Sequence, residues 1–284
     1  MTATHNFLST LTGVFASPVA ENPTGVMVEA AYRHHGVAAR YVNCDVAPEN
    51  LEAAVRGAVA MGWVGFNCSL PHKVAVMAFL DEIAESAALI GAVNCVVVRE
   101  GRLVGENTDG QGFLASLRTT VDPRSQVALV LGAGGAARAI AVELALAGAR
   151  KIVIANRSPQ RAADLARHVK ERTPADAAAI DWAGTLTVPD DAGIVINATS
   201  IGLFPHVDER PDLDYGSLGP ATAVADVIPN PPHTAFLRAA EARGCATIDG
   251  LGMLVNQAVI GIRLWTGVDA DTHVMRAALD ELFA

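Results

Sequence analysis

Short apolar runs alternate with amphipathic segments along most of the chain. Residues 127–131 (VALVL) and 151–155 (KIVIA) are continuous apolar runs, which are typical of buried parallel strands. Further strands are predicted at residues 12–16, 40–45, 64–67, 93–99, 103–105, 193–197, 223–228 and 246–248. Helices are predicted at residues 24–35, 48–61, 72–79, 82–89, 137–147, 233–243, 253–265 and 271–283. This alternation of strand and helix predicts an α/β protein.

Length and composition refine this prediction without changing it. The chain has 284 residues, which suits two domains of ordinary size, and 51% of them are apolar. The 21 basic and 30 acidic residues give a net charge of −9, and no basic tract interrupts the acidic balance. A nucleic-acid partner is therefore not expected, whereas a small-molecule partner is compatible with the composition.

The cysteines and the apolar runs indicate the cellular compartment of the protein. Cys44, Cys68, Cys95 and Cys245 are far apart in the sequence and form no CxxC pair, so we expect reduced, buried thiols and neither disulfides nor a metal site. No uncharged run has the length of a membrane span, and the N-terminal residues do not resemble a signal peptide. A cytoplasmic protein without membrane contact is predicted, as a monomer or a homodimer.

A glycine-rich turn follows the strand at residues 127–131 and opens the helix at 137–147. Its sequence, Gly132-Ala133-Gly134-Gly135-Ala136-Ala137, fits the GxGxxA pattern of dinucleotide-binding βαβ units. Gly132 permits the tight turn, Gly134 lets the backbone approach a pyrophosphate, and Ala137 keeps the helix close to the strand. The helix N-terminus then offers free N–H groups to phosphate. The segment therefore predicts a Rossmann-type nucleotide site.

The end of the second strand indicates which dinucleotide is bound. An NAD site usually has an acidic residue there, but this chain has Asn156-Arg157-Ser158, followed by Arg161. Arginine side chains can hold the 2′-phosphate of NADP with charge-assisted hydrogen bonds. Two arginines could also decorate an exposed helix start, although cations there oppose the helix dipole. We therefore predict NADP in preference to NAD.

Polar strings in the first half of the chain lie at predicted strand ends. They contain Asn67, Ser69 and Lys73, then Asn94, then Asp109. Each residue alone also fits a structural role, such as a helix cap for Asp109 or a turn cap for the asparagines. Together, a lysine, an aspartate, two asparagines and a serine at separate strand ends suit a polyhydroxylated substrate.

In this order, the strings resemble the motifs of the shikimate dehydrogenase family. The matching strings are NCSLPHK (67–73), IGAVNC (90–95), NTDGQGF (107–113), GAGGAARA (132–139), NRS (156–158), NATSIG (197–202), GLGMLVNQA (250–258) and WTG (265–267). They extend from about residue 41 to the C-terminus, and their shared register makes the resemblance specific.

The resemblance implies an α/β fold with two domains. An N-terminal substrate-binding domain would comprise residues 1–108 and be completed by the C-terminal helices at 252–284, and an NADP-binding Rossmann domain would comprise residues 109–251. The implied activity is the reversible NADP-linked reduction of 3-dehydroshikimate to shikimate, a step of aromatic amino-acid and chorismate biosynthesis.

The resemblance also implies a role for individual residues. Lys73 and Asp109 match the catalytic pair, with the lysine ammonium supplying a proton and the carboxylate orienting it. Matches to substrate contacts are Asn67, Ser69, Asn94 and Gln257. Matches to cofactor contacts are Gly132, Ala133, Gly134, Gly135, Ala136, Asn156, Arg157, Ser158, Arg161, Thr199 and Gly250, of which Thr199 and Gly250 would lie near the nicotinamide.

The chain departs from the family pattern at the substrate end. Near the N-terminus the family carries HSxSPxxHN, in which two serines hold the substrate carboxylate. Residues 17–24 read SPVAENPT instead, so that either Ser17 is kept from the pair or Ala20 and Asn22 replace both serines. Pro229 stands where the family has a tyrosine. A lost carboxylate contact would change recognition, so Ser17 and Asn22 are candidate substrate contacts.

These departures leave alternative functions open. One is a paralogue that acts on quinate or an aminoshikimate, where Glu21 would select an amine. Another is a lysine-dependent methylenetetrahydrofolate dehydrogenase, although the NTDG and MLVxQA strings argue against it. A third is a non-catalytic NADP-sensing regulator, but a sensor would need neither Lys73 nor Asp109.

Overall fold

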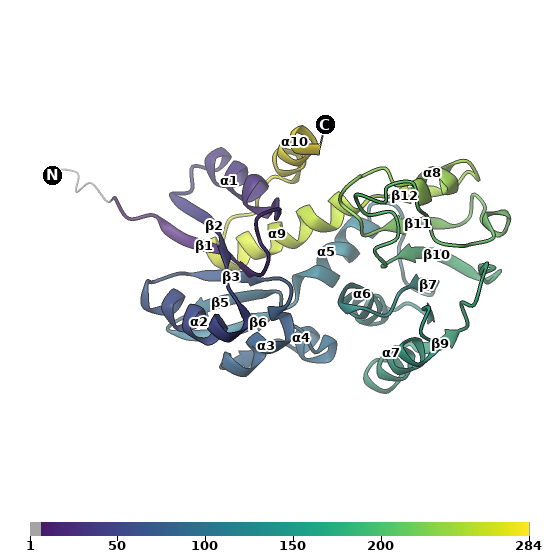
Figure 1. Ribbon diagram of the computed structural model, residues 1–284, viewed down its shortest axis with the longest axis horizontal. Helices are drawn as coiled ribbons and strands as arrows, with labels where there is room; N and C mark the ends of the chain where they lie inside the picture. Colours follow the sequence, from purple (N-terminus) through teal and green to yellow (C-terminus); the bar gives the residue numbers. More distant parts are fainter. Residues whose placement is uncertain (1–6, 284) are drawn as a thin grey trace. The chain divides into compact units, whose positions relative to one another are not determined.

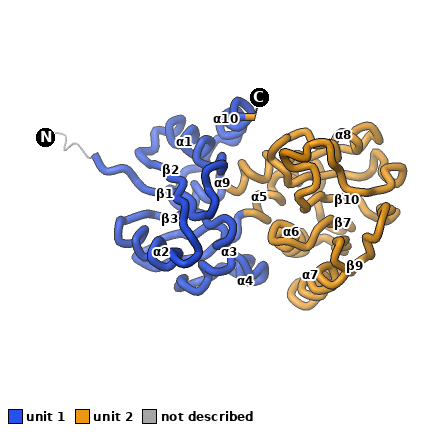
Figure 2. Tube along the Cα trace, viewed as in Figure 1, with its two compact units in different colours: residues 1–108, 258–282, 284 blue, residues 109–257, 283 orange. Residues whose placement is uncertain are grey.

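The computed structural model describes residues 7–283, and these divide into two compact units. Unit 1 comprises residues 7–108 and 258–282, and unit 2 comprises residues 109–257 together with residue 283. Figure 1 labels the elements along the chain, and Figure 2 colours the two units. Each unit has its own six-stranded sheet and its own helices, which confirms the predicted α/β class.

Unit 1 contains a mixed sheet in the order β2-β1-β3-β5-β6-β4. Its strands are β1 (Thr10–Ala16), β2 (Ala39–Asp45), β3 (Gly65–Cys68), β4 (Glu82–Ile83), β5 (Cys95–Arg99) and β6 (Arg102–Glu106). Strand β1 is parallel to β2 and β3, whereas β5 is antiparallel to both β3 and β6. The strand ends of β3 and β6 and the start of β5 therefore meet at one edge of the sheet.

Helices and 3-10 turns connect the strands of unit 1. They are α1 (Thr24–His34), η1 (Pro48–Asn50), α2 (Leu51–Ala60), α3 (His72–Ala75), η2 (Val76–Phe79) and α4 (Glu85–Ile90). The core packs Phe15 on Phe66 with ring centroids 4.5 Å apart, and Trp63 lies against the same phenylalanine ring. Aromatic rings thus supply much of the apolar surface that this sheet buries.

The C-terminal helices return to unit 1. Helix α9 (Gly250–Thr266) starts in unit 2 and ends in unit 1, and α10 (Thr272–Phe283) follows it. Near the end of α9, the indole Nε1 of Trp265 donates a hydrogen bond of 3.0 Å to the carbonyl oxygen of Val96 in β5. This buried bond joins residues far apart in the sequence and anchors the helix on the unit 1 sheet.

Unit 2 contains a fully parallel sheet in the order β12-β11-β10-β7-β8-β9. Its strands are β7 (Val127–Leu131), β8 (Lys151–Ala155), β9 (Asp176–Ile180), β10 (Ala192–Asn197), β11 (Ala223–Asp226) and β12 (Ala246–Ile248). The remaining elements are α5 (Thr108–Leu117), α6 (Gly135–Leu146), α7 (Pro159–Arg172), η3 (Tyr215–Ser217) and α8 (Ala235–Glu241). The strand order reverses between β7 and β10, which is where doubly wound sheets bind ligands.

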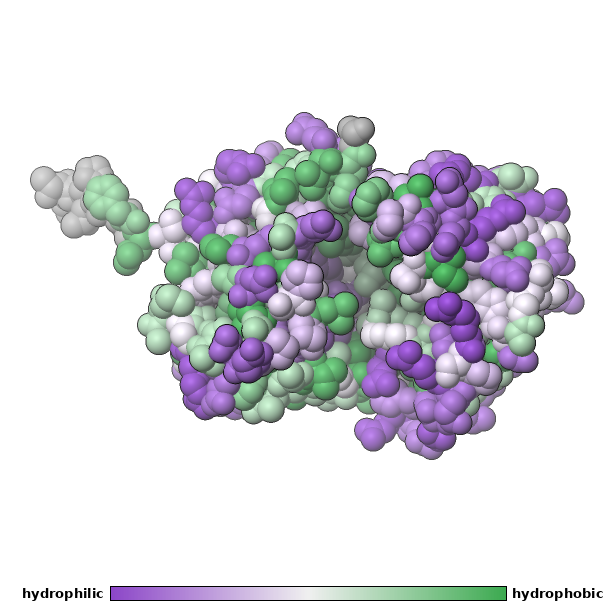
Figure 3. All heavy atoms as spheres, viewed as in Figure 1, coloured by the Kyte–Doolittle hydropathy of each residue, from purple (hydrophilic) through white to green (hydrophobic). Residues whose placement is uncertain are grey.

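Side chains of the unit 2 strands alternate between two apolar layers. Val130 and Ile154 pack with α6 and α7 on one face, while Leu129 and Val195 pack with Phe236 of α8 on the other. The outer surface of α7 is polar, as the purple residues around this helix in Figure 3 show. Both faces of the sheet are therefore covered, as a parallel sheet requires.

Several elements differ from the sequence prediction, among them helices α5 and α7, whose ranges were not predicted. The helix expected at 82–89 is split, because Asp81 and Ala84 donate backbone hydrogen bonds to Leu103 and Gly105 of β6 and hold β4 in the sheet. Strand β9 was not predicted, since its sequence DAAAI is short and weakly apolar at the sheet edge. Among the described residues, none of the helices combines the length and the apolar character that crossing a bilayer needs.

Candidate active site

A buried hydrogen-bond network in unit 1 joins neighbouring strand ends. The Tyr41 hydroxyl on β2 donates to Asn67 Oδ1 in β3 over 2.7 Å, and Asn67 Nδ2 donates to the carbonyl oxygen of Asn94 over 2.9 Å. All three residues are buried, and burial raises the pKa of the Tyr41 hydroxyl well above its usual value. The hydroxyl therefore stays a neutral donor that fixes the orientation of the Asn67 amide.

Asn94 connects this network to the start of helix α5. Its Oδ1 accepts a hydrogen bond of 2.7 Å from the backbone N–H of Thr108, and its Nδ2 donates to Thr108 Oγ1 over 3.0 Å. These bonds satisfy groups at the start of α5 that the helix itself leaves unpaired. Asp109 is the next residue and lies in the first turn, where the helix dipole favours a carboxylate.

Lys73 lies in the short helix α3, close to the same network. Its carbonyl oxygen accepts a 2.8 Å hydrogen bond from the backbone N–H of Val93, the residue before Asn94. Burial raises the pKa of the Cys68 thiol to about 12, and the positive charge of Lys73 opposes this shift. The Lys73 ammonium group thus influences the pKa of a thiol at the end of β3. An ammonium group at this place could donate a proton to the carbonyl oxygen of a substrate.

The segment that follows β1 contacts the NCSLPHK string. The backbone N–H of Ser17 donates to the carbonyl oxygen of Leu70, and that of Ser69 donates to the carbonyl oxygen of Phe15, each over 3.0 Å. The structure therefore brings the backbones of two predicted substrate contacts, Ser17 and Ser69, into one pair of neighbouring segments.

The other candidate in this segment, Asn22, has a structural task. Its side-chain Oδ1 accepts a 3.0 Å hydrogen bond from the backbone N–H of Thr24, the first residue of α1, and its carbonyl oxygen accepts one from Asn43 Nδ2. Its role as a substrate contact stays a prediction.

The glycine-rich turn of unit 2 has the geometry of a phosphate cradle. Gly132 has a φ of +112°, and a Cβ atom there would lie 2.9 Å from the carbonyl oxygen of Ala198, so a side chain would be both strained and crowded. At Gly134 and Gly135, by contrast, a Cβ atom would meet no protein atom within 4 Å. The backbone at the N-terminus of α6 therefore borders open space, and this fits the pyrophosphate of a dinucleotide.

The predicted 2′-phosphate clamp lies after β8. Arg157 and Arg161 are exposed. Arg161 lies in the first turn of α7, and this first turn contains no acidic residue. Asn156 Nδ2 donates to the carbonyl oxygen of Ser158 over 3.2 Å, which tightens the turn before the helix. Two guanidinium groups at a helix N-terminus favour an anionic ligand, so these residues fit the phosphate of NADP.

A second buried network occupies the ends of β10 and β11. Asn197 Oδ1 accepts hydrogen bonds from the backbone N–H and the hydroxyl of Thr199, over 3.1 and 2.6 Å. Asn197 Nδ2 donates to Asp226 Oδ1 over 3.1 Å, and Thr234 Oγ1 donates to Asp226 Oδ2 over 2.8 Å. Burial raises the pKa of Asp226 to about 6, although these donors oppose the shift.

The predicted residues of α9 are closely packed. Gly250 starts the helix, and Gln257 is buried, with its Nε2 donating to the carbonyl oxygen of Leu254 over 3.0 Å. A Cβ atom at Gly112 would lie 2.5 Å from the backbone nitrogen of Gln257, so α5 and α9 approach closely within unit 2. The substrate contact of Gln257 stays a prediction.

Family models match three parts of the chain. The shikimate dehydrogenase substrate binding domain matches residues 14–96, the shikimate / quinate 5-dehydrogenase model matches 115–202, and the shikimate 5′-dehydrogenase C-terminal domain matches 250–279. A protein of Desulforamulus reducens named shikimate dehydrogenase (NADP(+)) is 42% identical over 276 residues, or 96% of this chain and 95% of that protein. The chain belongs to the shikimate dehydrogenase family. The relationship that the motifs predicted is therefore confirmed.

Solved structures of the shikimate dehydrogenase family and its relatives share the fold. The ligand-free 5-ketofructose reductase of Gluconobacter sp. strain CHM43 has a TM-score of 0.96 and 57% identity, covering 98% of this chain and 100% of that one. Shikimate 5-dehydrogenase of Thermus thermophilus, solved with NADP(H) and shikimate, has a TM-score of 0.83 and 35% identity, covering 96% and 99%. The predicted architecture of substrate-binding and Rossmann-type NADP-binding parts is confirmed.

Sequence reasoning missed Tyr41 and Asp226 as parts of the site. Tyr41 precedes the polar strings by many residues, and only the register of the sheet brings it to Asn67. Asp226 ends a buried strand (AVAD), and a carboxylate there is the one signal that could have identified it.

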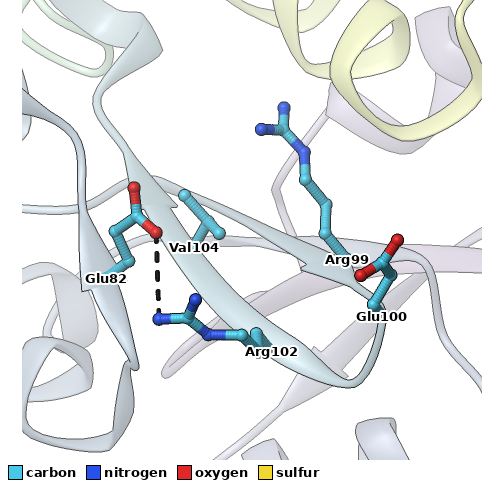
Figure 4. A pocket seen from close by; sticks show the side chains of 5 residues that line it. All are labelled: Glu82, Arg99, Glu100, Arg102 and Val104. Carbon is cyan, nitrogen blue, oxygen red and sulfur yellow. Dashed lines mark ion pairs between the residues drawn. The ribbon is translucent and has the colours of Figure 1, made fainter.

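A surface cavity in unit 1 contains none of the predicted site residues. It has a volume of about 510 Å³ and is lined by Glu82, Arg99, Glu100, Arg102 and Val104. In Figure 4, Arg102 extends toward Glu82, with which it forms an ion pair of 3.9 Å, and Arg99 points away from this pair. The two side chains of the pair are mostly exposed, so the ion pair adds little stability.

Proposed function

We propose that this protein interconverts a ketone and a secondary alcohol on a small polyhydroxylated molecule, with 3-dehydroshikimate and shikimate as the first candidate pair. The supporting observation is the 42% identity to a shikimate dehydrogenase (NADP(+)) over 96% of the chain, which includes the Lys73 and Asp109 strings. The chain is an NADP-dependent oxidoreductase that acts on a CH–OH group.

Lys73 and Asp109 would handle the proton. When bound, NADPH supplies a hydride to the carbonyl carbon of the substrate. Lys73 would donate a proton to the carbonyl oxygen as that oxygen gains negative charge, and in the reverse direction it would accept the hydroxyl proton. Asp109 would orient the lysine side chain and favour its charged form. Asn67 and Asn94 would bind substrate hydroxyls, together with Ser69 and Gln257.

The residues of unit 2 would hold the cofactor. Residues 132–136 would bind the pyrophosphate through the N-terminus of α6. Arg157 and Arg161 would bind the 2′-phosphate, with Asn156 and Ser158 shaping the turn between them. Thr199 and Gly250 would lie at the nicotinamide end. The proposal also places the enzyme in the cytoplasm as a monomer or a homodimer, a setting that suits its four free thiols.

A second candidate substrate is an uncharged polyhydroxylated ketone of the 5-ketofructose type. The 57% identity to 5-ketofructose reductase, with a TM-score of 0.96 over the whole of that chain, supports it. The segment at residues 17–24 supports it too, because the serine pair of the family pattern is altered there and the side-chain oxygen of Asn22 accepts a hydrogen bond from the backbone N–H of Thr24. When the serine hydroxyls that donate to a substrate carboxylate are changed, a site should discriminate less strongly between an acid and a neutral polyol.

Steady-state oxidation of NADPH by the purified protein separates these candidates. We would compare 3-dehydroshikimate with 5-ketofructose as substrates for reduction by NADPH, and shikimate with quinate as substrates for oxidation by NADP⁺. Efficient turnover of 3-dehydroshikimate supports the first candidate, and efficient turnover of 5-ketofructose alone supports the second. Tight NADPH binding without turnover of any of these compounds would refute both and favour a regulatory protein.

A further inference from the structure

Asp226 is a buried carboxylate to which neither the sequence motifs nor the proposed chemistry gives a task. Its side chain is 1% exposed at the end of β11. Oδ1 accepts hydrogen bonds of 3.1 Å from Asn197 Nδ2 and from the backbone N–H of Ile228, and Oδ2 accepts one of 2.8 Å from Thr234 Oγ1. Burying a carboxylate is costly, so a site that keeps one and surrounds it with donors requires an explanation.

The hydrogen bonds of Asp226 fix two loops. Through Asn197 they reach the turn at residues 198–201, because Asn197 Oδ1 accepts from Thr199 and Asn197 Nδ2 also donates to the carbonyl oxygen of Ile201 over 3.2 Å. Through Ile228 and Thr234 they fix the two ends of the loop at residues 227–234. A single carboxylate therefore sets the spacing between these loops.

The topology of unit 2 places both loops on the nicotinamide side of a bound dinucleotide. The phosphate cradle follows β7, and the predicted 2′-phosphate clamp follows β8 on one side of it. A dinucleotide that extends across the switch point must then direct its nicotinamide half to the other side, over the ends of β10 and β11. These are the strand ends that Asn197 and Asp226 occupy.

Close backbone packing connects the loops to residues already predicted for that half. A Cβ atom at Gly132 would lie 3.2 Å from the methyl carbon of Thr199, so the cradle rests on the 198–201 turn. A Cβ atom at Gly250 would collide with the carbonyl oxygen of Ile228, so the start of α9 rests on the 227–234 loop. A shift of either loop would therefore move the cradle or the start of α9.

We propose that Asp226 is a positioning residue for the nicotinamide half of NADP, acting through Asn197 on Thr199 and through Ile228 on the neighbouring loop. The proposal rests on the proposed binding of NADP to unit 2. It assigns to Asp226 no contact with the cofactor and no proton transfer. Its effect is on where the nicotinamide ring lies, and the adenosine half is held independently by the residues after β7 and β8.

The test compares a whole cofactor with its adenosine half. The dissociation constants of NADPH and of 2′,5′-ADP would be measured for the wild type, Asp226→Ala, Asp226→Asn and the control Asp191→Asn, which alters an exposed ion pair with Arg150 in the same unit. For Asp226→Ala we expect NADPH binding about tenfold weaker, as for the loss of a hydrogen bond to a charged group, with 2′,5′-ADP binding unchanged. Asp226→Asn keeps the acceptor at Oδ1 and can donate to Thr234, so it should largely restore NADPH binding.

Several outcomes would overturn the proposal. Equal losses for NADPH and 2′,5′-ADP would indicate a general structural role, and no loss for either would show that Asp226 positions nothing. If Asp226→Ala fails to fold, Asn197→Ala breaks the same connection while leaving the carboxylate in place, and unchanged NADPH binding in that variant would also contradict the proposal. A wild-type protein that binds neither ligand would instead refute the proposed function.

Discussion

The two buried networks at the strand ends differ in charge. In unit 1, the phenol of Tyr41, the amides of Asn67 and Asn94 and the hydroxyl of Thr108 form a network of neutral groups. In unit 2, the corresponding network is centred on the carboxylate of Asp226. Neutral groups keep their hydrogen bonds over a wide pH range, whereas a buried carboxylate changes its charge when the pH passes its pKa.

This difference separates the tasks of the two units. The neutral network of unit 1 fixes the amides that are proposed to bind substrate hydroxyls, and it adjoins Lys73 and Asp109, the proposed catalytic pair. The charged network of unit 2 fixes the 198–201 turn, which packs against Gly132, and the 227–234 loop, which packs against Gly250. We therefore expect proton chemistry beside the neutral network, at Lys73 and at Asp109 directly after Thr108, and cofactor geometry at the charged network, so variants at one network should leave the task of the other intact.

The largest effect is expected from the substitution Lys73→Ala. The loss of a general acid should lower kcat by about 10²- to 10⁴-fold, and the Kd of NADPH should hardly change because the proposed cofactor contacts lie in unit 2. Steady-state kinetics and a binding titration measure the two quantities. Lys170→Ala, which removes an exposed lysine paired with Asp176, is the matched control. A Lys73→Ala enzyme with near-normal turnover would exclude the role in proton transfer.

The opposite pattern is expected when Arg157 and Arg161 are both replaced by alanine. Loss of charge-assisted bonds to the 2′-phosphate should raise the KM of NADPH by roughly 10- to 100-fold, while kcat at saturation and the KM of NADH stay the same. The control is Arg167→Ala, which removes another exposed arginine of α7. An equal rise in the KM of NADPH and of NADH would show that these arginines do not bind the 2′-phosphate.

A smaller effect concerns the dependence of stability on pH. Because burial raises the pKa of Asp226 to about 6 from an ordinary 3.8, the folded protein keeps a proton between these values that the unfolded chain has lost. Stability should therefore fall as the pH rises from about 4 to about 6, by at most ~3 kcal/mol. Urea unfolding of the wild type and of Asp226→Asn across this range measures the contribution. If the free energy of unfolding depends on pH in the same way in both proteins, the raised pKa of Asp226 is contradicted.

The smallest effect is expected from Tyr41→Phe. This substitution leaves Asn67 Oδ1 buried without its hydroxyl donor, which should lower the free energy of unfolding by about 1–2 kcal/mol and raise the KM of the substrate several-fold. Neither change should depend on pH near neutrality, since the network carries no charge. Tyr215→Phe, which loses a hydroxyl bond to the Pro211 carbonyl in unit 2, should leave the substrate KM unchanged. An equal rise in the substrate KM of Tyr41→Phe and Tyr215→Phe would show that the Tyr41 hydrogen bond has no specific role in substrate binding.

The sequence predicted the parts of the fold that depend on local pattern. Buried runs such as VALVL and the glycine turn after it are local signals, and the structure has β7 and α6 at these positions. It did not predict β9, because an edge strand buries little and needs few apolar residues. Tyr41 and Asp226 were missed for a different reason: Tyr41 meets Asn67, and Asp226 meets Asn197, only through the register of neighbouring strands.

The proposed hydride and proton transfers are tested most directly by following deuterium from NADPH that carries deuterium at both C4 positions of the nicotinamide ring. We expect the wild type to place the deuterium on the carbinol carbon of the reduced product. We expect Lys73→Ala to bind the labelled cofactor normally but to transfer the deuterium at least about 10²-fold more slowly. Mass spectrometry of the product measures the transfer. Product that forms without the label would contradict hydride transfer from NADPH, and transfer at the wild-type rate by Lys73→Ala would contradict the role of Lys73 in proton transfer.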